Sequence, residues 1–127
     1  MKQFELNQTY CKVLSTISEL NKRTYYPLNE GIFNIVSGVI DDETEQFVDL
    51  LSFGTLTSFS SKKVCHLTLM LYKKGLLGRV FDPKSKKLYL RITEKGEQEL
   101  ELYFAKHKRG FAKRKLKITP TIIKIEG

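Results

Sequence analysis

Two stretches of the chain hold the excess of basic side chains, which are the residue types that bind phosphate groups. Residues 62–91 carry nine Lys or Arg and a single acid, Asp82, and residues 106–127 carry eight basic residues against Glu126. Residues 1–61 differ, with four basic and eight acidic side chains. Such a separation of charge is typical of a domain that contacts the phosphates of a nucleic acid with one side. The alternative interpretation is a lysine-rich surface that only contacts water.

The side chains that we expect to contact DNA fall into three groups, most of them suited to the phosphate contacts that position a protein on a duplex. The first group belongs to a helix predicted at 61–74, whose first-turn amides also attract phosphate: Ser60, Ser61, Lys62, Lys63, His66 and Lys73. The second group lies on a β-hairpin, or wing, predicted at 78–91: Arg79, Phe81, Lys84, Lys86, Lys87 and Tyr89. The third group lies in a basic C-terminal arm at 106–117: Lys108, Arg109, Lys113 and Arg114. The two hairpin aromatics have an alternative placement, packed against the core.

Other reactive residue types do not occur in a catalytic or metal-binding pattern. The two cysteines, Cys11 and Cys65, are too few for a four-cysteine zinc site, and we expect both to pack as small apolar side chains. The acidic cluster at 41–45 suits a helix N-terminus better than a metal. No Ser–His–Asp set, pair of catalytic carboxylates or Gly-rich phosphate loop stands out. We therefore expect no enzymatic activity, no metal and no cofactor.

Apolar spacing predicts that a mostly helical α+β domain positions the basic residues. Steps of three and four predict helices at 7–21 with Asn7 as N-cap, after Asn29, at 61–74, and after the N-cap Thr93, with a short helix opened by the acidic residues 42–45. The second of these helices should turn five apolar residues inward: Ile32, Phe33, Ile35, Val36 and Val39. Two alternating stretches on either side of a turn at 82–86 predict the hairpin.

The helix at 61–74 separates into two faces when its residues are placed about 100° apart. Val64, Leu67, Thr68 and Leu71 fall on one arc, which should be buried. Lys62, His66, Leu69 and Lys73 fall on the opposite arc, which should face outward. A helix with a basic outward stripe is how a DNA-contacting helix would be built.

Length and composition exclude several classes of protein. The chain has 127 residues, 41% of them hydrophobic, and a net charge of +8, which fits one domain with one modest core. No apolar run approaches the roughly 18 residues of a membrane span, and the first residues lack the apolar stretch of a signal peptide. We therefore expect a cytoplasmic protein, nucleoid-associated if bacterial, with no membrane partner. We divide it into a domain at 1–105 and a basic arm at 106–127 that holds a candidate terminal strand.

The order of helices followed by a hairpin and a last helix is that of a winged-helix domain. Over about residues 9–102 the chain resembles the RQC domain of RecQ-family DNA helicases. The resemblance is carried by Tyr10-Cys11-Lys12-Val13-Leu14, Ile35-Val36-Ser37-Gly38, Leu51-Ser52-Phe53-Gly54, Leu71-Tyr72-Lys73-Lys74-Gly75-Leu76 and Leu88-Tyr89-Leu90-Arg91-Ile92-Thr93-Glu94-Lys95-Gly96. It implies binding of duplex DNA near a junction, in DNA repair or replication, and in some family members a wing aromatic separates the end base pair.

The chain departs from the whole helicases of that family in two respects. It has no Gly-x-x-x-x-Gly-Lys-Ser/Thr loop, which an ATPase core needs, and it lacks the cysteine-rich zinc module that precedes the RQC domain. The resemblance therefore implies a free-standing DNA-binding domain. Two other interpretations stay open. One is a homodimeric transcriptional regulator with the third main helix in the major groove of an operator, and the other is a winged helix that binds an acidic protein.

Overall fold

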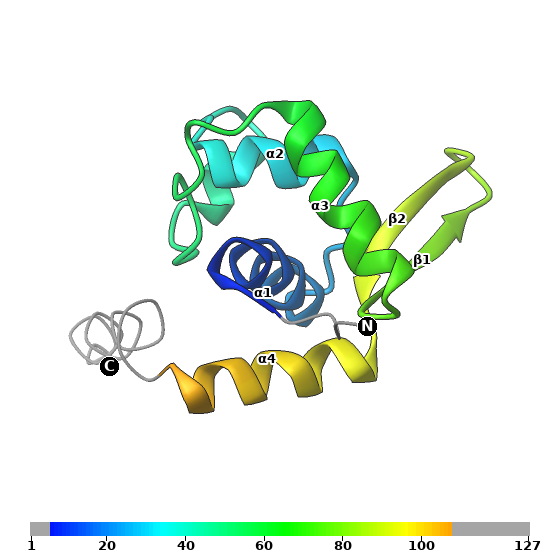
Figure 1. Ribbon diagram of the computed structural model, residues 1–127. Helices are drawn as coiled ribbons and strands as arrows, with labels where there is room; N and C mark the ends of the chain where they lie inside the picture. Colours follow the sequence, from blue (N-terminus) through cyan, green and yellow to red (C-terminus); the bar gives the residue numbers. More distant parts are fainter. Residues whose placement is uncertain (1–5, 108–127) are drawn as a thin grey trace, which may run out of the picture.

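The computed structural model describes residues 6–107 as a mostly helical α+β fold (Figure 1). Its elements in chain order are α1 (Gln8–Lys22), α2 (Asn29–Ser37), the 3₁₀ helix η1 (Thr44–Phe47), α3 (Ser61–Lys73), β1 (Leu77–Asp82), β2 (Lys87–Ile92) and α4 (Glu94–Lys106). The predicted class and element order are confirmed for this part of the chain. Within it, no helix is both long and apolar enough to cross a membrane. Most of the predicted arm, including Lys108, Arg109, Lys113, Arg114 and the candidate strand, lies outside the described residues.

Helix α1 is the centre of the molecule, with α2 and α3 on one side and α4 on the other (Figure 1). The side chain of Asn7 caps it as predicted, accepting a hydrogen bond of 2.8 Å from the Tyr10 amide. Its buried side chains form the middle of the core: Cys11, Val13, Leu14, Ile17 and Leu20. Because three helices pack around it, α1 is buried over a broader arc than a helix on the surface would be.

Helix α2 ends earlier than its apolar spacing indicates. Ile32, Ile35 and Val36 are buried as predicted, but Val39 lies beyond the end of the helix and is 41% exposed. The helix stops because Gly38 adopts a φ of +84°, and a Cβ there would lie 3.2 Å from the Cα of Gly54. The chain returns at this point, and the amide of Gly54 donates to the carbonyl of Ile35 over 2.9 Å. The predicted inward position of Val39 was therefore wrong.

The short helix predicted after the acidic residues is only the four-residue η1. Its N-cap residue, Glu43, makes no capping side-chain bond, but the carboxylate of Asp41 accepts hydrogen bonds from the amides of Thr44 (2.8 Å) and Glu43 (2.9 Å). Both bonds lower the pKa of Asp41, and the bond from the Thr44 amide has the largest effect. Phe47 and Leu50 are buried, and Leu50 lies in a turn beyond the end of η1.

Strands β1 and β2 form the predicted hairpin, antiparallel and in register from Leu77 opposite Ile92 to Asp82 opposite Lys87. The hairpin is fixed to the helices through β2. The amide of Leu90 donates to the carbonyl of Pro27 over 2.8 Å, and the amide of Ile92 donates to Asn21 Oδ1 over 2.7 Å. The base of the hairpin therefore has a defined orientation, while its tip extends away from the helices (Figure 1).

A tight junction connects the end of α3 to the start of α4. The Thr93 hydroxyl accepts from the Gly96 amide over 3.0 Å, as the predicted N-cap should, and it donates to the Gly75 carbonyl over 2.7 Å. The Thr93 amide donates to the Leu76 carbonyl over 3.1 Å. Gly96 packs against the same carbonyl so closely that a Cβ would lie 2.3 Å from the oxygen. This junction sets the angle at which the hairpin leaves α3.

Candidate nucleic-acid interface

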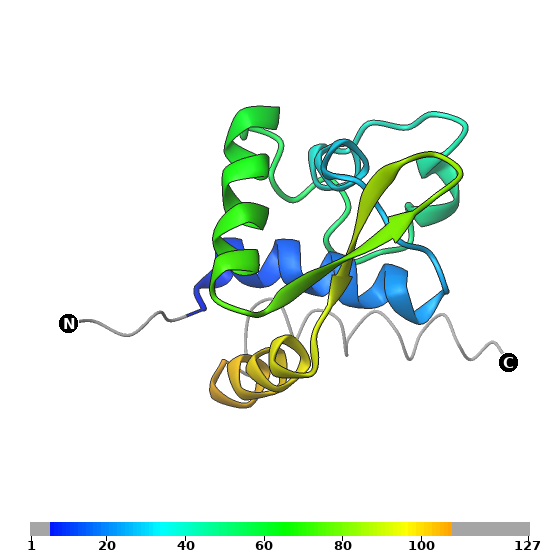
Figure 2. The same ribbon diagram turned by 90° about the vertical axis from the view of Figure 1, so that its right-hand side faces the viewer.

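Helix α3 presents the predicted basic stripe to solvent. Ser60 caps the helix, its hydroxyl accepting from the Lys63 amide over 3.1 Å, and Ser61, Lys62 and Lys63 in the first turn are exposed. The predicted inner arc is buried, and the outer arc of Lys62, His66, Leu69 and Lys73 is exposed. Figure 2 shows α3 at the upper left edge of the molecule, with α2 to its right and α1 and α4 below it. Both face assignments made from the apolar spacing are therefore confirmed.

The hairpin exposes four of its six predicted contact residues at or near the tip: Phe81, Lys84, Lys86 and Lys87. Arg79 is exposed too, but nearer the base of β1. Tyr89 is only half-buried, and its hydroxyl lies 3.1 Å from the hydroxyl of Ser85 in the turn. The alternative placement of Phe81 against the core is wrong, because 57% of its surface is exposed.

Leu88 joins Phe81 as a second exposed apolar residue at the tip. The register pairs the two directly across the hairpin, and Leu88 is 49% exposed. Residues opposite each other in an antiparallel pair share one face. Leu88 was absent from the predicted contact residues, although the alternation of the two strands around the turn would have placed it beside Phe81.

Arg79 is oriented by an aromatic ring that was not among the predicted contact residues. Its guanidinium carbon lies 4.1 Å from the centroid of Tyr72, which places the positive charge over the ring face. Tyr72 is on α3 and 40% exposed, so this contact bridges α3 and β1 at the surface. Arg91, which was not predicted either, packs over Gly78, where a Cβ would lie 3.5 Å from its guanidinium carbon.

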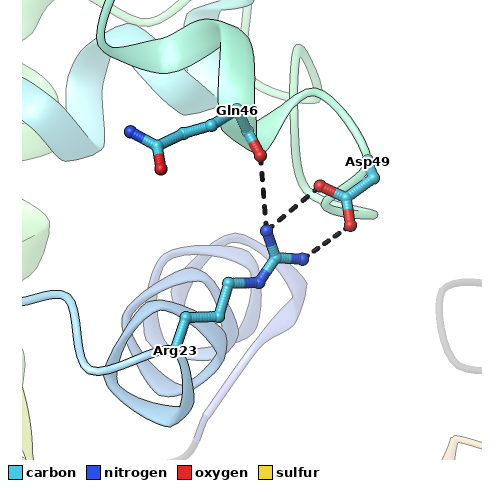
Figure 3. Close-up of polar contacts among 3 residues, drawn as sticks. All are labelled: Arg23, Gln46 and Asp49. Carbon is cyan, nitrogen blue, oxygen red and sulfur yellow. Dashed lines mark hydrogen bonds and ion pairs between the residues drawn. The ribbon is translucent and has the colours of Figure 1, made fainter.

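The basic residues of α3 and the hairpin form no ion pair with any residue among 6–107. The ion pairs in this part of the chain join Lys22 to Glu19 (4.0 Å) and Arg23 to Asp49 (2.6 Å). Figure 3 shows the second, in which Arg23 also donates to the carbonyl of Gln46 over 3.4 Å. Seven candidate cations are therefore uncompensated: Lys62, Lys63, Lys73, Arg79, Lys84, Lys86 and Lys87. Unpaired exposed cations on neighbouring elements sum to a positive surface potential.

The two cysteines and several acidic residues, which are residue types used in catalysis and metal binding, are at least partly buried or have partners within the fold. Cys11 is fully buried, and burial raises the pKa of its thiol to about 12, although Lys12 opposes the shift. Cys65 is half-buried on the flank of α3. Over residues 6–107, no group of three His, Cys, Asp or Glu side chains lies close enough to hold a metal ion. Several acids of the 41–49 segment have partners within the fold, with Glu43 accepting from the Tyr25 hydroxyl and Asp49 pairing with Arg23.

Comparison of the chain with protein-family models, with curated proteins and with solved structures found no match. Function is therefore inferred from the residues and their placement. The structure brings the α3 stripe and the hairpin together through the turn at 74–76, and the contact between Tyr72 and Arg79 joins them at the surface. The four predicted arm residues are not placed, since they follow the described part of the chain.

Proposed function

We propose that this chain is a winged-helix domain that binds duplex or branched DNA, mainly through phosphate contacts from α3, the hairpin and the C-terminal arm. The element order supports the winged-helix assignment, with β1 and β2 as the wing. The short bond from the Leu90 amide to the Pro27 carbonyl adds a third segment beside the wing. The proposed role is binding, because most of the exposed candidate residues are lysines and arginines.

One observation carries this proposal: the seven uncompensated cations lie on two elements that are adjacent in space. Residues 62–91 hold nine basic side chains against one acid, Asp82, whereas a surface that only contacts water usually mixes charges of both signs. Lysine and arginine without partners bind phosphates by displacing the counterions that surround DNA. The pattern therefore favours nucleic acid over a solvated lysine surface.

The resemblance to RQC domains narrows the proposal to DNA near a junction. In support, the tip of the wing exposes Phe81 and Leu88 on one face, where they are free to contact an end base pair. The domain would then bind DNA at the sites where a helicase or repair enzyme acts.

The decisive experiment measures affinity for a generic duplex against salt by fluorescence anisotropy. Six phosphate contacts predict a loss of roughly 10³-fold between about 50 and 200 mM salt. A flat response would contradict phosphate-dominated binding. Forked and single-stranded DNA of the same length, measured in parallel, distinguish junction binding from general duplex binding, and binding to none of them would favour an acidic protein partner instead.

A homodimeric regulator is the second candidate, because the outward stripe of α3 includes two residues, His66 and Leu69, that are not phosphate-binding cations. Such residues suit contacts to base edges in a major groove. Stoichiometry separates the two candidates. A regulator binds a palindrome as two copies, whereas a junction-binding domain binds a fork as one.

A further inference from the structure

Leu69 is out of place on a surface that only binds phosphates. It lies on the outward arc of α3, between His66 and Lys73 along the helix axis, and it is 38% exposed. The face of α3 that packs against the core is formed by Val64, Leu67 and Leu71, all of which are buried. Leu69 is therefore not part of the buried core, and over a third of its surface is open to a partner.

The stripe is long enough to span a major groove. Lys62, His66, Leu69 and Lys73 lie within an arc of about 60° on a helix with 3.6 residues per turn. The two lysines are separated along the axis by about 16 Å, at a rise of 1.5 Å per residue. A major groove is about 12 Å wide, so lysines at the two ends of the stripe can reach the phosphates on either side of it. The two middle residues then face the base edges.

We infer that Leu69 contacts the C5 methyl group of thymine, with His66 on a neighbouring base edge, and so gives this DNA-binding surface a preference for thymine in the major groove. The thymine methyl is the only apolar group that the base pairs present there. A branched aliphatic side chain can only gain from a base edge by covering that methyl. His66 can donate a hydrogen bond to the N7 or O6 acceptors of a purine. This inference rests on the proposed function, because it needs α3 to contact duplex DNA.

The flanks of the stripe limit how α3 can enter the groove. On the side toward the hairpin, Tyr72 is covered by Arg79, which adds a cation beside Lys73. On the other side, Lys63 is exposed in the first turn. Both flanks therefore carry phosphate-binding groups, and Leu69 lies between them, on the side of the stripe nearer to Tyr72. A base-contacting helix needs both kinds of group, cations for the phosphates and other side chains for the base edges.

The test replaces thymine by uracil in an otherwise identical A·T-rich duplex, which removes the methyl group and leaves the hydrogen-bonding edges unchanged. Removing one methyl group that the protein buries should weaken binding of the natural chain about fourfold. Leu69→Ala should bind the thymine duplex about as weakly as the natural chain binds the uracil duplex, and it should no longer distinguish the two. Leu102→Ala is the matched control, because Leu102 is an exposed leucine on α4, 56% exposed. It should behave like the natural chain.

The outcomes separate this inference from the proposed function. Equal binding of both duplexes by the natural chain, with a steep salt dependence, would overturn the role of Leu69 and leave DNA binding intact. If Leu69→Ala prefers the thymine duplex over the uracil duplex as strongly as the natural chain does, the inference is also overturned, because the effect of the methyl group would then arise elsewhere. No binding to either duplex at low salt would overturn the proposed function itself. If Leu69→Ala does not fold, binding of the thymine and uracil duplexes by the natural chain still tests whether the surface contacts the thymine methyl.

Discussion

Lys62 and Lys73 occupy the two ends of the α3 stripe, where each is exposed and unpaired among residues 6–107. Exposed charges of this kind contribute little to stability, so replacing both by alanine should change the free energy of unfolding by less than about 0.5 kcal/mol. Affinity for duplex DNA should fall several-fold, measured by anisotropy at about 50 mM salt. Lys22→Ala removes one charge from the end of α1 and should leave affinity nearly unchanged. If the double variant binds as the natural chain does, the hairpin and the arm carry the interaction and α3 only supports them.

Cys11 makes stability depend on pH in the alkaline range. Burial raises the pKa of its thiol from 9.0 to about 12, so the unfolded chain loses this proton at a lower pH than the folded chain. The stabilisation is complete below about pH 9 and is lost as the pH rises toward 12. Cys11→Ala should be less stable at pH 7.5, because it leaves a small cavity. The difference between the two urea midpoints should narrow by pH 10.5. A constant difference would mean that Cys11 does not carry the dependence.

Under the proposed function, the hairpin determines whether the domain only contacts the DNA backbone or also separates base pairs. Phe81 and Leu88 lie opposite each other at its tip, and an aromatic ring that stacks on a base is worth about 1–3 kcal/mol. This is similar to the cost of unstacking one base step, so the domain could open one or two pairs but could not unwind DNA processively. Phe81→Ala should reduce the preference for a fork over a blunt duplex and leave duplex affinity intact. A fluorescent base analogue at the fork should report the opening, and a signal that stays constant on binding would rule it out.

The junction between α3, the hairpin and α4 depends on the missing side chain of Gly96. A Cβ there would lie 2.3 Å from the Leu76 carbonyl oxygen and 2.7 Å from Ile92 Cγ1. Gly96→Ala should therefore destabilise the fold by about 2 kcal/mol, because the overlap outweighs the gain of about 1 kcal/mol in helix propensity. Gly31→Ala is the control, since its nearest contact would be an ordinary 3.7 Å to Pro27. It should be neutral or slightly stabilising in urea unfolding. Equal effects of the two variants would contradict a close-packed junction.

The sequence predicted elements well where a period or a cap identified them. Asn7 and Thr93 cap helices as expected, and the outward stripe of α3 followed from spacing alone. The prediction from sequence failed where packing between separate elements determines the end of a helix or the orientation of a side chain. Helix α2 ends before Val39 because Gly54 returns against Gly38, and Arg79 is oriented by Tyr72. Neither contact has a local signal, since both depend on how separate elements pack. Leu88 is the exception, because strand alternation alone would have identified it.

At the scale of the whole molecule, charge is separated in space as well as along the chain. In Figure 1 the hairpin extends to the right, while the segment that holds η1 lies on the left. That segment carries five acids between residues 41 and 49: Asp41, Asp42, Glu43, Glu45 and Asp49. Under the proposed function, repulsion between these carboxylates and phosphates should disfavour approach from that side and so orient the domain on DNA.

The arm is the largest part of the positive charge outside α3 and the hairpin. Residues 108–127 contain seven of the 22 basic residues and one of the 14 acids, so a chain that ends at His107 has a net charge of +2 in place of +8. The buried core formed by the described residues extends from Cys11 to Leu100, so this shorter chain should fold with nearly the same thermal midpoint. Its affinity for duplex DNA should fall, and the slope of log affinity against log salt should decrease by about 0.9 for each phosphate that the arm binds.

Replacing Lys84, Lys86 and Lys87 together by alanine provides the comparison, because that variant removes three hairpin charges and keeps the arm. If the arm and the hairpin bind separate phosphates, the two decreases in slope should add when the changes are combined. A slope that the truncation leaves unchanged would show that the arm binds no phosphate, and the α3 stripe and the hairpin would then account for the whole interface. A truncated chain that fails to fold would instead place residues after His107 in the core, and the boundary predicted between the domain and the arm would be wrong.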